Sequence, residues 1–280
     1  MNLTEVQKLI AQYGLSPTKS KGQNFLLDEG VLEHIVSFSE IKNGDRVVEI
    51  GPGFGALTEV ILQKTDKVTL IELDDALYGY QKKTYASRAK IIHKDVLRVT
   101  NQEIFDTAGG EYHVVSNIPY NITSPIIQKF TEIQPKPVTM TLMIQKEVAQ
   151  RICSKPGDMS ILSVAVQLYA DVQYGFEVKR ALFWPAPQVD SAVIKITPHK
   201  RYTDQLKVSE KDFFRIVKFG FAAKRKKLVN TLAAGLHKEA SDIKPYLEKI
   251  GLHENVRAQE LSVEQWIVLA QELQILSSKF

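Results

Sequence analysis

A glycine-rich loop, Glu49-Ile50-Gly51-Pro52-Gly53-Phe54-Gly55, follows a short apolar segment in the first quarter of the chain. Its three glycines, Gly51, Gly53 and Gly55, allow the backbone to turn tightly and to approach a ligand closely. Glu72 ends the next apolar segment, 17 residues after Gly55. A carboxylate at that place can accept hydrogen bonds from both hydroxyls of a ribose. The combination predicts a site for a cofactor that contains a nucleoside.

Two classes of cofactor fit this loop. Residues 51–56, Gly-Pro-Gly-Phe-Gly-Ala, match a relaxed form of the dinucleotide fingerprint G-x-G-x-x-G/A. The spacing G-x-G-x-G, with Glu49 two residues before the first glycine, is typical of proteins that bind S-adenosylmethionine. Asp95, after a third apolar segment, is placed to bind an adenine amino group, although alone it is also typical of a loop or a helix cap.

The segment Asn117-Ile118-Pro119-Tyr120 is the most specific signal in the chain, because it follows a fourth apolar segment. It suits methylation of an exocyclic amine. If the Asn117 side-chain oxygen and a backbone carbonyl such as that of Ile118 accept the two hydrogens of adenine N6, the nitrogen lone pair is oriented for attack. Pro119 stiffens the turn, and Tyr120 can stack on the base, which contributes about 1–3 kcal/mol.

With these motifs in place, the sequence resembles the ribosomal RNA adenine dimethyltransferases of the KsgA (RsmA) type. Seven motifs carry the resemblance, in the order of the family. They are residues 22–26 (GQNFL), 49–58 (EIGPGFGALT), 72–74 (ELD), 117–122 (NIPYNI), 145–151 (QKEVAQR), 183–193 (FWPAPQVDSAV) and 225–230 (RKKLVN).

The resemblance implies S-adenosylmethionine as methyl donor, two adjacent adenines near the 3′ end of small-subunit ribosomal RNA as acceptors, and a partly assembled, pre-30S-like subunit as the substrate. It implies that Phe183 closes over the target adenine opposite Tyr120. The implied cofactor contacts are Asn24, Leu26, Gly51, Gly53, Gly55, Glu72, Asp95 and Asn117.

Two departures from the family pattern are small: Lys94 stands where a glycine is common, and Gln188 where a lysine is common. Three alternatives stay open. An Erm-type enzyme that methylates large-subunit RNA shares the segment 117–120, a non-catalytic assembly or transcription factor can use the same fold, and a dehydrogenase fits only the relaxed fingerprint.

Short apolar segments alternate with amphipathic ones, which predicts an α/β, Rossmann-like domain with a mostly parallel sheet covered by helices on both faces. In such sheets ligands bind beyond the carboxyl ends of the strands. A first helix is expected over 4–12, capped by Thr4, and a second is capped by Asp28. The pattern predicts strands at 46–50, 68–72, 90–93, 112–116 and 138–144, and helices at 57–63, 76–85 and 124–133.

The pattern changes toward the C-terminus. Residues 161–178 and 189–197 indicate further β structure, and 209–277 indicate helices with breaks near Gly220, Gly235 and Gly251. We therefore expect a methyltransferase domain with an N-terminal helical extension over 1–200 and a helical domain over 201–280. The charge follows this division: residues 1–200 are neutral, 201–230 carry +6, and 231–280 carry −2. The basic cluster predicts RNA contacts at Lys218, Lys224, Arg225, Lys226 and Lys227.

Composition sets the remaining bounds. With 280 residues, 44% hydrophobic and 24% charged, the chain is an ordinary globular one rather than a disordered one. The single cysteine, Cys153, excludes a disulfide framework and a multi-cysteine metal site. No transmembrane segment or secretory signal is apparent, so we expect a cytoplasmic protein that contacts no membrane, binds no metal and works as a monomer.

Overall fold

The computed structural model describes residues 2–14 and 24–277, which form two compact units. The first unit comprises residues 1–150 and 171–198, and the second comprises 151–170 and 199–280. The chain therefore passes from one unit to the other three times. Residues 151–170 belong to the same unit as the C-terminal helices. The boundary expected from the sequence, between residues 200 and 201, places them in the first domain.

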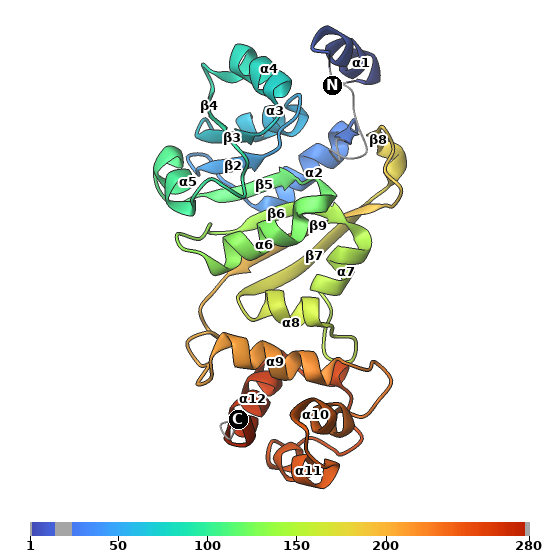
Figure 1. Ribbon diagram of the computed structural model, residues 1–280. Helices are drawn as coiled ribbons and strands as arrows, with labels where there is room; N and C mark the ends of the chain where they lie inside the picture. The colour runs from blue at the N-terminus through green and yellow to red at the C-terminus, as the bar shows by residue number, and fades with distance from the viewer. Residues whose placement is uncertain (1, 15–23, 278–280) are drawn as a thin grey trace. The chain divides into compact units, whose positions relative to one another are not determined.

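The first unit is built on a seven-stranded sheet with the strand order β4-β3-β2-β5-β6-β9-β7 (Figure 1). Its elements are α1 (Leu3–Gln12), β1 (Phe25–Leu26), α2 (Glu29–Ser39), β2 (Val47–Ile50), α3 (Ala56–Leu62), β3 (Val68–Glu72), α4 (Asp75–Tyr85), β4 (Ala89–His93), α5 (Asn101–Ala108), β5 (His113–Asn117), η2 (Tyr120–Ile122), α6 (Thr123–Glu132), β6 (Met140–Gln145), α7 (Lys146–Ile152), β7 (Ala170–Val178), η3 (Arg180–Leu182), β8 (Phe183–Trp184) and β9 (Ser191–Pro198).

The strand order reverses between β2 and β5: β3 and β4 follow on one side of β2, and β6 follows on the other side of β5. A ligand site is expected at this switch point. Strands β4, β3, β2, β5 and β6 run parallel, and β9 pairs with β6 antiparallel. β2 and β5 pair only at their first residues, Val47 with His113 and Val48 with Val114. Beyond them, the hydroxyl of Ser116 accepts the backbone N–H of Ile50 at 2.7 Å. The two strand ends diverge there and leave a crevice.

Helices cover both faces of the sheet. Leu32, Ile35 and Val36 of α2 pack with Leu57 and Ile61 of α3 in one core cluster, which also holds side chains from β2, β3, β5, β6 and β9. Every residue of β2 and β3 is buried, which requires cover on the other face as well. α5 lies against β3, and the Asn101 amide at its start donates to the carbonyl of Ile133 after α6.

The second unit is a helical bundle with its own core. It consists of α8 (Ile161–Gln167), α9 (Glu210–Gly220), α10 (Leu228–Leu236), α11 (Ala240–Lys249), η4 (Ala258–Glu260) and α12 (Val263–Ser277). Trp266 is fully buried at its centre. A Cβ on Gly220 would lie 2.3 Å from the Trp266 ring, and a Cβ on Gly235 would lie 2.3 Å from Phe219. These two glycines therefore let α9, α10 and α12 pack closely.

The α/β fold class predicted from the sequence is confirmed, and the expected strands and helices of the first 145 residues lie within two residues of the observed ones. Three expectations are wrong. Residues 161–167 are helical rather than β, because Ser160 and Ser163 form a capping box that starts α8. Gly235 lies inside α10 instead of breaking a helix. The cap of α1 is Asn2, whose side chain accepts the N–H of Glu5, rather than Thr4.

Candidate active site

A cavity of about 830 Å³ opens at the carboxyl ends of β2, β3 and β5, within the range of about 300–1,000 Å³ typical of small-molecule sites. It is lined by residues 24–26, 49–54, 72–77, 94–97 and 117–122, with Val6 and Gly14 from the N-terminal segment. The structure thus brings together the glycine loop, Glu72, Asp95 and the segment 117–120, as the sequence predicts. Gln23 and the basic stretch 16–22 lie outside the described residues.

The glycine loop owes its shape to three left-handed residues. Gly51, Gly53 and Gly55 have φ angles of 64°, 59° and 82°, which favour glycine strongly. Gly51 and Gly53 line the cavity, whereas Gly55 caps α3 and faces the protein interior. A Cβ on Gly55 would lie 2.1 Å from the hydroxyl of Tyr85 in α4. The absence of a side chain at Gly55 therefore lets the loop pack on Tyr85, and a cofactor contact of Gly55 stays a prediction.

Glu72 is fixed by donors on both carboxylate oxygens. Oε1 accepts the backbone N–H groups of Leu73 and Asp74 at 2.8 and 2.9 Å, and Oε2 accepts Nε2 of Gln81 at 3.1 Å. Burial raises the pKa of Glu72, and these hydrogen bonds oppose the rise. The same Gln81 amide donates to the carbonyl of Gly53 at 2.9 Å. Gln81 therefore ties the ribose-binding candidate to the glycine loop, a contact that the sequence analysis did not identify.

Glu49 is a second buried carboxylate on the cavity wall, and it is the acidic residue of the glycine motif. It is 2% exposed, and its Oε2 accepts the hydroxyl of Thr58 at 2.6 Å. Burial raises the pKa of Glu49 to about 8, and the nearby charge of Glu72 adds to the rise. Its position two residues before Gly51 was the available signal.

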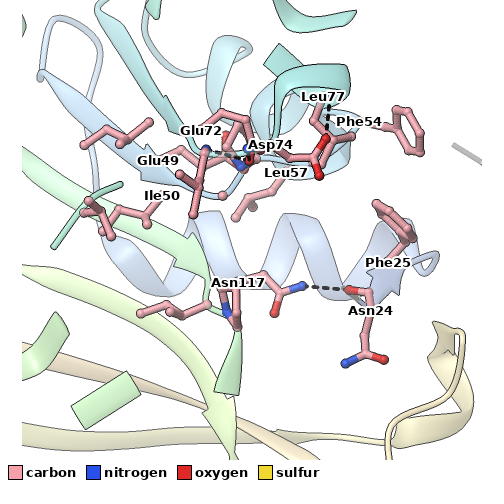
Figure 2. A pocket seen from close by; sticks show the side chains of 18 of the residues that line it. Asn24, Phe25, Glu49, Ile50, Phe54, Leu57, Glu72, Asp74, Leu77 and Asn117 are labelled. Carbon is pink, nitrogen blue, oxygen red and sulfur yellow. Dashed lines mark hydrogen bonds between the residues drawn. The ribbon is translucent and has the colours of Figure 1, made fainter. Parts of the chain in front are cut away.

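Asn117 ends β5 at the cavity, with its side-chain amide oriented by the protein. Figure 2 shows its Nδ2 donating to the backbone carbonyl of Asn24, at 3.4 Å. Because that carbonyl can only accept, the amide NH₂ is the end that faces it, and Oδ1 is the acceptor end for another partner. The next residue, Ile118, donates its backbone N–H to the carbonyl of Met143, which holds the chain in place.

Tyr120 begins the short helix η2 directly after Pro119, and its side chain is half-buried. Its hydroxyl lies 2.7 Å from the hydroxyl of Ser191. Burial raises the pKa of Tyr120, so the side chain is a neutral phenol at ordinary pH. Asn117, Ile118, Pro119 and Tyr120 all line the cavity, as the hypothesis for base methylation requires.

The remaining cofactor candidates, Asn24, Leu26 and Asp95, also line the cavity. Leu26 is 4% exposed and pairs with Phe183, so β1 forms one wall. Asp95 accepts the backbone N–H of Leu97 at 2.9 Å, which is the loop-capping role considered from the sequence. This contact uses Oδ1, and Oδ2 lies 3.8 Å from Nε of Arg98.

Phe183 is the residue that the resemblance places over the target adenine, opposite Tyr120. Its side chain is 4% exposed and packs in the core cluster with Leu26 and Val178. It is not among the described residues that line the cavity. Its backbone pairs with that of Leu26, where β8 meets β1, and its place over the target base stays a prediction.

The predicted RNA contacts lie in the second unit. Lys218 is in the last turn of α9, and Lys224, Arg225, Lys226 and Lys227 occupy the connection to α10. All five side chains are exposed. Within residues 2–14 and 24–277, no helix has the length and hydropathy that a membrane span requires. In the same ranges, no three His, Cys, Asp or Glu side chains are grouped as metal ligands.

Comparison with known proteins decides the family. Residues 15–275 match the family described as ribosomal RNA adenine dimethylase. The chain belongs to the ribosomal RNA adenine dimethylase family. Similar relatives are each named ribosomal RNA small subunit methyltransferase A. One, from Desulfitobacterium hafniense (strain DCB-2), is 40% identical, with 95% of each chain covered. Another, from Dehalococcoides mccartyi (strain CBDB1), is 37% identical, with 96% of this chain and 93% of the relative covered.

Two solved structures share the fold of this family member. A dimethyladenosine transferase from Plasmodium falciparum has a TM-score of 0.75 at 24% identity, covering 90% of this chain and 98% of that one. The 23S rRNA methyltransferase ErmE has a TM-score of 0.69 at 23% identity, covering 89% and 99%. At these identities the likeness concerns the fold, and it does not separate the two classes of RNA substrate.

The residues of the dimethylase fit the cofactor that the sequence predicts. Glu72 and Asp95 present carboxylates, which suit hydroxyl and amino donors, and the turn at Gly51 and Gly53 brings backbone close to the cavity. Phe25 stacks on Phe54 with ring centroids 5.2 Å apart and closes one end with apolar surface. A nucleoside with a charged amino-acid tail requires hydrogen-bond acceptors for its hydroxyl and amino groups, backbone that approaches it closely, and apolar surface against its base.

Proposed function

We propose that this enzyme dimethylates two adjacent adenines near the 3′ end of small-subunit ribosomal RNA, and that it acts on a partly assembled, pre-30S-like subunit. The coarser activity follows from the family: the chain is an S-adenosylmethionine-dependent ribosomal RNA adenine dimethyltransferase of the small-subunit type. We propose further that it works as a monomer in the cytoplasm, where such subunits are assembled.

The observation that carries the proposed chemistry is the oriented amide of Asn117. S-adenosylmethionine supplies a methyl group on a sulfonium, and the electrons of the broken C–S bond stay on sulfur. Asn117 Oδ1 and the backbone carbonyl of Ile118 accept the two N6 hydrogens, so that the nitrogen lone pair can form the new N–C bond. The N6 proton becomes acidic only as that bond forms and passes to water, so no strong base is required.

The surrounding residues supply orientation. The carbonyl of Asn24 holds the NH₂ end of the Asn117 amide, and Pro119 limits the backbone between Asn117 and Tyr120. The ring of Tyr120 provides a stacking surface for the base. Holding reactants in this way contributes a large part of the rate in methyl transfer, and displacement by about 1 Å can cost 10²-fold.

The first prediction tests Asn117 itself. Asn117→Ala removes the acceptor for N6, so we expect methyl transfer to fall about 100-fold or more while affinity for the small subunit stays within about twofold. The assay incubates labelled S-adenosylmethionine with small subunits that lack the modification, and binding is measured separately by filtration.

Three outcomes would contradict the proposals. Absence of label from the 3′-terminal fragment of small-subunit RNA with the unaltered enzyme would overturn the assigned target. Labelling of large-subunit RNA instead would favour the Erm-type alternative. Methylation that survives Asn117→Ala would show that another group orients N6.

A further inference from the structure

The hydroxyl of Tyr120 is held by a residue that the proposed mechanism does not use. Ser191 Oγ lies 2.7 Å from Tyr120 Oη, and Ser191 is fully buried. The two residues are 71 positions apart and belong to two of the motifs that were recognised separately, 117–122 and 183–193. The contact thus joins these motifs at Tyr120, which lines the cavity.

Ser191 is anchored independently of Tyr120. It is the first residue of β9 and pairs with Gln145, the last residue of β6. The preceding Asp190 accepts the backbone N–H of Arg180 at 3.0 Å and pairs with Lys179 at 3.0 Å. The strand pairing and these contacts determine where the Ser191 hydroxyl lies, so Tyr120 is positioned by Ser191 rather than the reverse.

The hydrogen bond persists at ordinary pH. Burial raises the pKa of Tyr120, so the phenol keeps its proton and can either donate to Ser191 or accept from it. Tyr120 lies in a single turn of 3-10 helix after Pro119, and no residue of that turn is buried. Without a partner for its hydroxyl, the ring would have fewer contacts to fix its plane.

We propose that Ser191 is a positioning residue that fixes the ring of Tyr120, and that the second methyl transfer depends on it more than the first. This inference rests on the proposed function. Adenine N6 carries two hydrogens, which Asn117 Oδ1 and the Ile118 carbonyl can hold. After one methyl transfer only one hydrogen remains, so one of these two contacts is lost. The orientation of N6-methyladenine then depends more on the stacking surface, and therefore on the ring plane.

The test compares Ser191→Ala, Tyr120→Phe and the double variant in the full-length enzyme. Single-turnover reactions with unmethylated small subunits measure N6-methyladenine and N6,N6-dimethyladenine over time. In each single variant we expect the second transfer to slow about fivefold relative to the first, so that N6-methyladenine accumulates. Because both substitutions remove the same hydrogen bond, the double variant should be no slower than either single one.

Two further variants separate positioning from general loosening of the structure. Ser191→Thr keeps a hydroxyl and should restore most of the second transfer. Ser39→Ala removes another buried serine hydroxyl of the same unit, which donates to the carbonyl of Val36 at 2.6 Å and accepts the N–H of Ile41 at 3.5 Å, and should leave the product ratio unchanged.

Equal slowing of both transfers in Ser191→Ala, or effects that multiply in the double variant, would overturn the inference. If Ser191→Ala lowers the melting temperature severely, Tyr120→Phe still decides the question, since it removes the same bond and leaves the fully buried Ser191 unchanged. Failure of the proposed function gives a different result, namely no N6,N6-dimethyladenine in small-subunit RNA from the unaltered enzyme.

Discussion

Two buried carboxylates on one cavity wall differ in how the protein supports their charge. Glu72 receives two backbone N–H groups and a side-chain amide, whereas among residues 2–14 and 24–277 the donor to Glu49 is the Thr58 hydroxyl. A buried carboxylate with few hydrogen-bond donors favours its protonated form. Burial therefore raises the pKa of Glu49 to about 8. Glu49 is thus the group whose ionisation should be most visible in stability measurements.

The second prediction follows from that pKa. Between the usual value of 4.5 and about 8, folded Glu49 keeps a proton that the unfolded chain releases. The free energy of unfolding should therefore fall as pH rises through this window, by at most about 1.4 kcal/mol per pH unit from this group. Glu49→Gln should flatten the dependence, as measured by urea unfolding at pH 5, 6, 7 and 8.

Glu59→Gln is the matched control. Hydrogen bonding to Arg88 lowers the pKa of Glu59, so its stabilising contribution is lost only as the pH falls below the usual carboxyl range. The slope between pH 5 and 8 should persist in that variant. A slope that persists equally in Glu49→Gln would show that Glu49 is ionised in the folded protein.

At the scale of elements, α1 is an unexpected part of the cavity. Val6 is 1% exposed and packs with Phe54 of the glycine loop and Leu77 of α4. Val6 and Gly14 also line the cavity. The short helix thus covers the same wall that the glycine loop forms, although the sequence indicated only a helical extension before the catalytic domain.

The third prediction tests whether the packing of α1 on the glycine loop supports cofactor binding. Val6→Asp places a charge in the contact with Phe54, so α1 should detach and the affinity for S-adenosylmethionine should fall roughly tenfold, in line with the loss of one buried aliphatic side chain. Gln7→Asp makes the same change at an exposed position of the same helix and should have little effect. Calorimetric titration measures both, and equal losses would show that α1 contributes nothing specific to the site.

How far the sequence predicts the elements depends on where their stability comes from. β2 and β3 are buried on both faces, and their short, largely apolar segments identify them. α8 was misassigned because Ile161, Val164 and Val166 are β-branched, whereas its helix depends on a capping box and on packing of Val164 in the second core. α5 was missed, although Thr100 caps it, Glu103 lies in its first turn and Gly109 ends it.

The residues of the candidate site also differ in how far the sequence predicts their positions. Residues at the ends of parallel strands, such as Glu72 and Asn117, are predictable because topology brings strand ends together. The contacts of Gln81 and Ser191 were not, since they depend on side chains that reach across distant segments. Phe183 is the opposite case: its motif implies a place at the base, which stays a prediction, whereas its side chain is 4% exposed beside the pairing of β8 with β1.

At the scale of the whole molecule, the net charge of +4 conceals an uneven distribution. Residues 1–200 are neutral, and the segment 201–230 carries +6. Lys224, Arg225, Lys226 and Lys227 are exposed in one connection between α9 and α10. We therefore propose separate tasks for the two regions: the cavity selects the base, and the basic connection contacts the phosphates of the RNA.

The fourth prediction separates local phosphate contacts from the field of the whole protein. Arg225→Glu with Lys226→Glu should weaken binding to the small subunit and lower the slope of log affinity against log salt by about one to two, because each contacted phosphate releases about one counterion. Lys42→Glu with Lys64→Glu changes the net charge equally at exposed positions of the first unit. If net charge alone governs binding, the two double variants will behave alike in a salt titration. If the basic connection contacts RNA, only the first will lose slope, and its rate of methyl transfer at saturating subunit concentration will remain close to that of the unaltered enzyme, because Asn117 and Tyr120 are untouched.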